Sequence, residues 1–200
     1  VAPPHTPARR MMRTACLPTL ATAVAAVAVV AILRRRRRVT YFLSGVMGGS
    51  GGGGQSLANI AVESQDYRAQ LREAILFVSP DADIVDPATR LEQIAPSLHA
   101  AGTPVADWWG DDTAVRKAFE ECVRLASQAD VLVSFLPCAS MGSAVELHAA
   151  RSAGRLILVI APGKMRGNWV VRSYADAVFE DVAGLRTWLQ AHRDGRRMLT

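Results

Sequence analysis

Four residues close together in this sequence have side chains or backbone groups that could hold a small molecule. Ser140, Gly142, Ser143 and Glu146 lie in the stretch SMGSAVE, which follows an apolar run and ends in a carboxylate. The start of a helix carries unpaired backbone N–H groups and a partial positive charge, which suit an anionic ligand. For the same reason we expect Glu146 to stay ionised, as a first-turn residue of that helix. The alternative interpretation is that Glu146 only interacts favourably with the helix dipole.

The flanking sequence predicts a strand before this stretch and a helix after it. Residues 130–136 (DVLVSFL) are typical of a buried parallel strand, and residues 143–153 have helical composition up to Gly154. The same alternation recurs along the chain: we predict strands at 39–45, 82–85, 155–161 and 177–179, helices near 65–72 and at 113–128 and 181–192, and a short helix or turn at 168–174.

This alternation of strand and helix predicts the fold class. Strands that alternate with helices form parallel sheets, because each connection must cross over the sheet. We therefore expect an α/β, doubly wound, flavodoxin/Rossmann-like parallel sheet of about five strands with helices on both faces. Ligands bind such sheets at the carboxyl ends of the strands, where the strand order reverses.

A glycine-rich stretch at residues 48–54 follows the first predicted strand. Such loops can let the backbone approach a phosphate, which makes Gly48 and Gly49 candidate binding residues. The stretch lacks the Lys-Ser/Thr of a P-loop and the spaced glycines of a dinucleotide fingerprint, so a plain flexible loop is the alternative.

The charge of the chain is divided unevenly. The net charge is +5, but residues 1–38 hold eight Arg and no acidic residue, so the remaining residues carry 15 Lys+Arg against 18 Asp+Glu. A slightly acidic domain with 6% aromatic residues does not favour a nucleic acid polymer as partner. The three cysteines have neither C-x-x-C nor Cys/His spacing, so we expect no metal, no cofactor and no disulfide framework.

The N-terminal region predicts a targeting or membrane segment. Residues 1–13 are assigned to a disordered N-terminus, residues 14–33 form an uncharged apolar stretch of 20 residues, and residues 34–38 are five arginines. Twenty apolar residues suffice to cross a bilayer, and basic residues remain on the cytoplasmic side. We therefore expect a single-pass anchor with the domain, residues 39–200, on the cytoplasmic side. A transit peptide that directs the chain to an organelle, or a disordered tail, are the alternatives.

Two motifs resemble those of a known enzyme family. Residues 41–49 (YFLSGVMGG) look like a first strand that ends in a Tyr-Phe pair before a Gly-rich loop, and residues 140–146 look like a Ser-x-Gly-x-x-x-Glu loop that opens a later helix. Both motifs, in this order, are similar to those of the nucleoside 2-deoxyribosyltransferase superfamily, which includes the 2'-deoxynucleoside 5'-monophosphate N-glycosidases. The likeness extends over residues 39–189.

The resemblance implies specific roles for these residues. Glu146 matches the carboxylate that attacks C1' of a deoxyribose to form a glycosyl-enzyme intermediate, and Tyr41 matches a residue that positions this nucleophile. Ser140 and Gly142, with Ser143 beside them, match the positions that hold a 5'-phosphate. Asn168 could cover the base, although a packing role is an equal alternative. A homodimer is expected because the family's sites are completed across an interface.

One position departs from the family pattern. The family's second catalytic acid, an Asp, corresponds to Cys122 in this sequence, next to Glu121. Either Glu121 substitutes from a neighbouring helical direction, about 100° away, or the acid is missing. Two hypotheses follow: an enzyme that cleaves or transfers at the N-glycosidic bond of a nucleoside or its 5'-monophosphate, or a non-catalytic nucleotide-binding module tethered to a membrane.

Overall fold

The structure is a computed structural model that describes residues 38–46, 66–90 and 112–192. Within these ranges the strands are β1 (Thr40–Gly45), β2 (Asp83–Val85), β3 (Val131–Phe135), β4 (Leu156–Ile160) and β5 (Ala177–Phe179). The helices are α2 (Asp66–Val78), α4 (Asp112–Gln128), α5 (Met141–Ser152), α6 (Trp169–Tyr174) and α7 (Val182–Ala191), with a 3-10 helix, η3 (Gly163–Gly167), before α6.

The five strands form one parallel sheet in the order β2-β1-β3-β4-β5. This confirms the predicted α/β fold with a flavodoxin-like strand order. The strand order reverses between β1 and β3, so a crevice is expected outside the carboxyl ends of these two neighbours. The register pairs Ser44 of β1 with Ser134 of β3 close to those ends.

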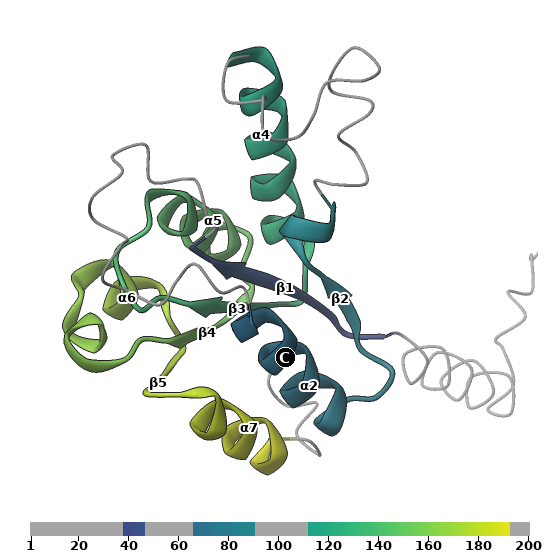
Figure 1. The fold of residues 1–200 in the computed structure, drawn as a ribbon, viewed down its shortest axis with the longest axis vertical. Helices are drawn as coiled ribbons and strands as arrows, with labels where there is room; N and C mark the ends of the chain where they lie inside the picture. The colour runs from purple at the N-terminus through teal and green to yellow at the C-terminus, as the bar shows by residue number, and fades with distance from the viewer. Residues whose placement is uncertain (1–37, 47–65, 91–111, 193–200) are drawn as a thin grey trace, which may run out of the picture. The chain divides into compact units, whose positions relative to one another are not determined.

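Helices cover both faces of the sheet (Figure 1). On one face, α2 and α7 pack against the side chains of Tyr41 and Leu43. On the other face, α4, α5 and α6 pack against Phe42 and Leu132. Because side chains alternate along a strand, each strand contributes residues to both cores, which explains the continuous apolar runs of β3 and β4.

Helix ends are defined by local hydrogen bonds. Ser140 caps the start of α5, where its hydroxyl accepts a hydrogen bond from the backbone N–H of Ser143 at 3.2 Å. After the last residues of α5 the chain adopts a positive φ of 68° at Gly154, which favours glycine and ends the helix as predicted. At α7, Asp181 accepts from the N–H of Gly184 at 2.8 Å.

The predicted membrane-anchored location is corrected by the structure. In the part of the chain that the structure describes, no helix is long and apolar enough to cross a membrane. Residues 14–33, on which the prediction of an anchor or a transit peptide was based, lie outside the described residues.

Candidate active site

Glu146 is buried against the sheet by its position on α5. The inward side of this helix carries Ser143, Glu146, Leu147 and Ala150, the spacing of one helical face. Glu146 retains only 7% of its exposure, and it lies in the second turn of α5 because the helix begins at Met141. The expectation of a first-turn position is therefore wrong. The dipole acts chiefly within the first turn, so packing decides the environment of this carboxyl group.

Two serine hydroxyls connect Glu146 to the sheet. Ser44 Oγ donates a hydrogen bond of 2.6 Å to Glu146 Oε2, and Ser134 Oγ donates one of 3.3 Å to Ser44 Oγ. Both serines are almost fully buried, and they face each other across β1 and β3. The carboxyl group is thus held at the point where the strand order reverses, which is the place expected for a ligand site.

Burial raises the pKa of Glu146 to about 7. Loss of water penalises the charged form, while the hydrogen bond from Ser44 and the positive charge of Arg68 lower the pKa and only partly offset this effect. The expectation that the helix N-terminus keeps Glu146 fully ionised is therefore wrong. Its carboxyl group changes charge near neutral pH.

A buried ion pair lies beside Glu146 at the ends of β1 and β2. Arg68, in the first turn of α2, places Nη1 2.8 Å from Asp86 Oδ1 and donates a hydrogen bond of 3.2 Å to the carbonyl oxygen of Leu43. Asp86 also accepts a hydrogen bond of 3.0 Å from the N–H of Ala88. Arg68 thereby links α2 to β1 and to the end of β2, and it supplies positive charge where a buried carboxylate would otherwise be isolated.

Tyr67 covers the end of β1. Its ring stacks on Phe135 with the centroids 4.8 Å apart, and its hydroxyl donates a hydrogen bond of 3.1 Å to the carbonyl oxygen of Val46. A Cβ at Gly45 would lie 2.6 Å from that hydroxyl, so only glycine fits there. Burial raises the pKa of Tyr67 to about 12, and the phenol stays protonated.

The residue at the expected position of the second acid is a buried thiol. Cys122 on α4 has its pKa raised to about 12, first by burial and then by the negative charges of Glu146 and Glu121. Glu121 points away from this interior. Its two carboxylate oxygens each accept a hydrogen bond of 2.7 Å from Arg124 on the surface of α4, and Arg90 lies 3.9 Å away. The structure therefore does not bring Glu121 to Glu146 as a substitute acid.

Tyr41 lies on the opposite face of the sheet from Glu146. Its side chain belongs to the core beneath α2 and α7, where burial raises its pKa and Ser79 hydrogen-bonds its hydroxyl. Ser44, three residues along β1, points to the other face and contacts Glu146. The structure separates Tyr41 from the carboxyl group that it was expected to position, because an odd number of residues along a strand changes the face.

The remaining predicted binding residues fall into two groups. Ser140, Gly142 and Ser143 form the start of α5, and the buried hydroxyl of Ser143 makes no hydrogen bond within the described residues. Asn168 caps α6, where its Oδ1 accepts from the N–H groups of Val170 at 2.9 Å and Val171 at 3.4 Å. This gives Asn168 a structural role in the helix start. Gly48 and Gly49 lie outside the described residues.

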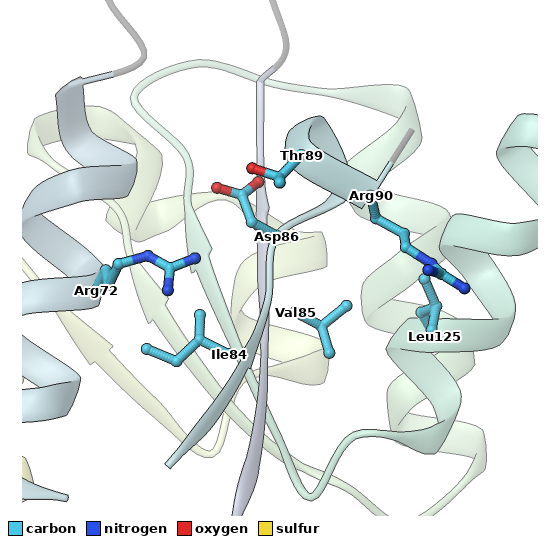
Figure 2. A pocket seen from close by; sticks show the side chains of 7 residues that line it. All are labelled: Arg72, Ile84, Val85, Asp86, Thr89, Arg90 and Leu125. Carbon is cyan, nitrogen blue, oxygen red and sulfur yellow. The ribbon is translucent and has the colours of Figure 1, made fainter. Parts of the chain in front are cut away.

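A cavity of about 270 Å³ opens at the end of β2. Its wall includes Asp86, which also pairs with Arg68, so the cavity adjoins the network around Glu146. Figure 2 shows Arg72 reaching in from α2 on one side of β2, with Leu125 and Arg90 on the other. The full lining is Arg72, Ile84, Val85, Asp86, Thr89, Arg90 and Leu125. No cluster of three or more potential metal-binding side chains occurs within the described residues.

Comparison with solved structures supports the same fold. A 2-deoxyribosyltransferase from Bacillus psychrosaccharolyticus aligns with a TM-score of 0.51 and 13% sequence identity, over 74% of this chain and 90% of that enzyme. This chain shares the fold of that 2-deoxyribosyltransferase. At this level of identity the likeness establishes the fold, in agreement with the family resemblance of the two motifs.

Two other solved structures are similar at a lower TM-score. A conserved protein from Enterococcus faecalis aligns at 0.49 with 15% identity, over 78% of this chain and 99% of its own. A CMP N-glycosidase from Clostridium botulinum aligns at 0.41 with 12% identity, over 76% of this chain and 98% of its own. No protein-family model matches the chain. A search of curated proteins found no significant match.

Several residues of this candidate site were not predicted from the sequence: Ser44, Ser134, Arg68, Asp86 and Tyr67. One pattern, present in two strands, could have revealed the serines. Each interrupts an otherwise apolar strand one residue before its last, in the runs YFLSG and VLVSF. A polar side chain in a buried strand needs a partner, so two such serines near the ends of strands indicate a polar site there.

Proposed function

We propose that this protein cleaves or transfers at the N-glycosidic bond of a nucleoside or its 5'-monophosphate, with Glu146 as the nucleophile. The observation that carries this proposal is the buried carboxyl group of Glu146, held by Ser44 at the switch point of the sheet. The shared fold with a 2-deoxyribosyltransferase and the Ser140 to Glu146 motif support the same reaction class.

The proposed mechanism has two steps. In the first, an ionised oxygen of Glu146 forms a bond to C1' of the sugar while the C1'–N bond breaks, and the base leaves with the bonding electron pair and takes up a proton from water. In the second, water attacks C1', the ester bond to Glu146 breaks, and the proton of that water returns to solvent. In transfer, a second base replaces the water.

The site has the electrostatic properties that this mechanism requires. A nucleophilic carboxylate must be ionised but poorly solvated, and a pKa of about 7 for a buried group provides both at neutral pH. Arg68 offsets part of the negative charge. The start of α5, with Ser140 and the unbonded hydroxyl of Ser143, is the predicted site for a phosphate.

The test incubates the full-length protein with a panel of nucleosides and 5'-monophosphates. Chromatography then measures the free base that is released. We expect Glu146→Gln to lower the rate by roughly three orders of magnitude or more, because the nucleophile is lost while the shape is kept. Glu73→Gln, which alters an exposed carboxylate on α2, is the matched control. Equal release by the wild type and the Glu146→Gln variant would rule out the mechanism.

A non-catalytic nucleotide-binding module is the second candidate, and Cys122 is the observation that favours it. A thiol with a pKa of about 12 is a poor proton donor to a leaving base at neutral pH. In this case the protein binds one of the panel compounds, as measured by calorimetry, without any release of base. Binding together with wild-type turnover that depends on Glu146 would eliminate this candidate.

A further inference from the structure

We propose that Ser44 and Ser134 are positioning residues: their hydroxyls form a one-way relay from β3 through β1 to Oε2 of Glu146, and leave Oε1 as the attacking oxygen. This inference deepens the proposed function and rests on it for the identity of the reaction. It assigns a role to two residues that neither the sequence motifs nor the fold likeness singled out.

The direction of the relay follows from the number of protons. A serine hydroxyl has one proton to donate, and Ser44 directs its proton at Glu146 Oε2, 2.6 Å away. Ser44 Oγ can then only accept from Ser134, whose Oγ lies 3.3 Å away. Both donors therefore point toward the carboxyl group. This arrangement stabilises an ionised acceptor more than a protonated one.

Burial shows that the serines are not ordinary strand residues. Ser44 is 1% exposed and Ser134 is fully buried, each among apolar neighbours. A buried hydroxyl without a partner costs free energy, and a Val or Ala would fill either position without that cost. Within the described residues, the hydroxyl of Ser134 donates to Ser44, and the hydroxyl of Ser44 donates to Glu146. The hydrogen bond to the carboxyl group of Glu146 thus explains why two serines are buried at these positions.

The geometry also distinguishes the two oxygens of Glu146. Ser44 fixes Oε2, and Oε1 makes no hydrogen bond within the described part of the chain. Because β1 and β3 are paired in register at Ser44 and Ser134, both hydroxyls sit on paired strands, and the one on Ser44 fixes the position of Oε2. A nucleophile held in this way loses little rotational freedom when it attacks.

Other charged and titratable groups around Glu146 must be kept constant in a test. Arg68 and Tyr67 face it from α2, and Cys122 faces it from α4. Of these, Arg68 is the group that favours the ionised form together with Ser44. Substitution of the serines leaves all three in place, so a change in the titration of Glu146 reports on the relay alone.

The experiment measures the pKa of Glu146 directly in the full-length protein, by ¹³C NMR of glutamate-labelled samples. The resonance that Glu146→Gln removes identifies the group. We expect Ser44→Ala to raise the pKa by about one unit or more, since it removes a hydrogen bond to a charged group. Ser134→Ala should give a smaller shift in the same direction, and Ser44→Thr, which keeps the hydroxyl, should stay near the wild type. Ser127→Ala, which removes an exposed hydroxyl on α4, should change nothing.

The second measurement is the pH profile of kcat/KM for base release. The acid limb should move to higher pH in Ser44→Ala by the same amount as the NMR titration, whereas a purely structural role would lower kcat/KM without moving the limb. If Ser44→Ala does not fold, Ser44→Cys, which has a similar volume and a weaker donor, replaces it. A folded Ser44→Ala or Ser44→Cys protein with an unchanged pKa of Glu146 would overturn the relay.

The two proposals fail in different ways. If the wild type releases no base but the serine variants shift the titration of Glu146, the relay stands and the proposed reaction is wrong. If Glu146 is needed for base release but the serine variants leave its titration unchanged, the reaction stands and the relay is wrong.

Discussion

Asp86 at the end of β2 and Glu146 above the ends of β1 and β3 are both largely removed from water, but they have different partners. Asp86 contacts the guanidinium of Arg68 at 2.8 Å, and their side chains are 10% and 6% exposed. Glu146 has a neutral hydroxyl at 2.6 Å. A guanidinium supplies a full counter-charge to a carboxylate, whereas a hydroxyl only reduces the cost of its charge.

This difference separates a structural carboxylate from a reactive one. Asp86 Oδ1 accepts hydrogen bonds from the guanidinium of Arg68 and from the N–H of Ala88, so this carboxylate has a charged partner and a backbone partner. Glu146 changes charge near pH 7 and keeps one oxygen without a hydrogen bond in the described residues. Because Arg68 also lowers the pKa of Glu146, the two regions are coupled, and variants of either should affect the other.

The largest effect on stability is expected when the ion pair is broken. Arg68→Met should destabilise the protein by about 3 to 5 kcal/mol, because Asp86 is left buried without a counter-charge. Denaturant unfolding at pH 7 measures this. Arg151→Met, which breaks the exposed pair with Asp176, is the matched control and should cost less than about 1 kcal/mol.

A double substitution sharpens the interpretation of that result. Replacing Arg68 and Asp86 together by Met and Leu should recover much of the lost stability, because no isolated charge remains. If Arg68→Met costs no more than Arg151→Met, the pair at the end of β2 is not a buried structural element and the contrast with Glu146 fails.

The next effect concerns Glu146 and depends on pH. The folded-state pKa of about 7 lies above the ordinary value of 4.5, so the protein binds this proton more tightly when folded. The resulting stability is fully present below about pH 4.5, is lost as the pH rises to about 7, and changes little above that. Glu146→Gln has no such proton. Its free energy of unfolding should exceed that of the wild type increasingly between pH 5 and 7, by up to about 3 kcal/mol, and the difference should level off by pH 8.

Unfolding curves at pH 5, 6, 7 and 8 measure this difference. Glu73→Gln, at an exposed position of α2, serves as the control. A difference between wild type and Glu146→Gln that stays constant across this range would mean that the carboxyl group of Glu146 is not held in a desolvated environment.

The smallest expected effect arises from a second carboxyl group at Cys122. Cys122→Asp should destabilise the protein by roughly 1 to 3 kcal/mol, because it buries a polar group on α4. It should also move the acid limb of the activity profile to higher pH, since two carboxyl groups that interact share a proton. A gain in base release at neutral pH would show that an acid at this position assists the leaving group. No gain, with ligand binding retained, would favour the binding module.

Much of the fold could be predicted because the signal is local. The apolar runs of β3 and β4 and the helix-ending Gly154 each indicate their own structure, and observed strand ends differ from the predicted ones by about one residue. Ser140 and Asp181 start their helices through side chains that accept a hydrogen bond from the N–H three residues ahead. Interactions of this range are encoded within a few residues of sequence.

The candidate site was predicted less completely because its contacts are long-range. Ser44 and Glu146 are 102 positions apart, and Arg68 reaches Asp86 across a strand connection. Tyr41 was chosen from its motif, but strand alternation turns it to the face opposite Glu146. Glu121 is on the right helix, yet its carboxylate is held on the surface by Arg124.

By itself the sequence determined the order of strands and helices, the helix that carries Glu146 and the glycine that ends it. These depend on apolar periodicity and on hydrogen bonds between near neighbours. Only the tertiary structure decided which side chains meet at the switch point and what charge Glu146 carries. The physical reason is that a pKa depends on burial and on partners from β1, α2 and α4, which come together only when the sheet has formed.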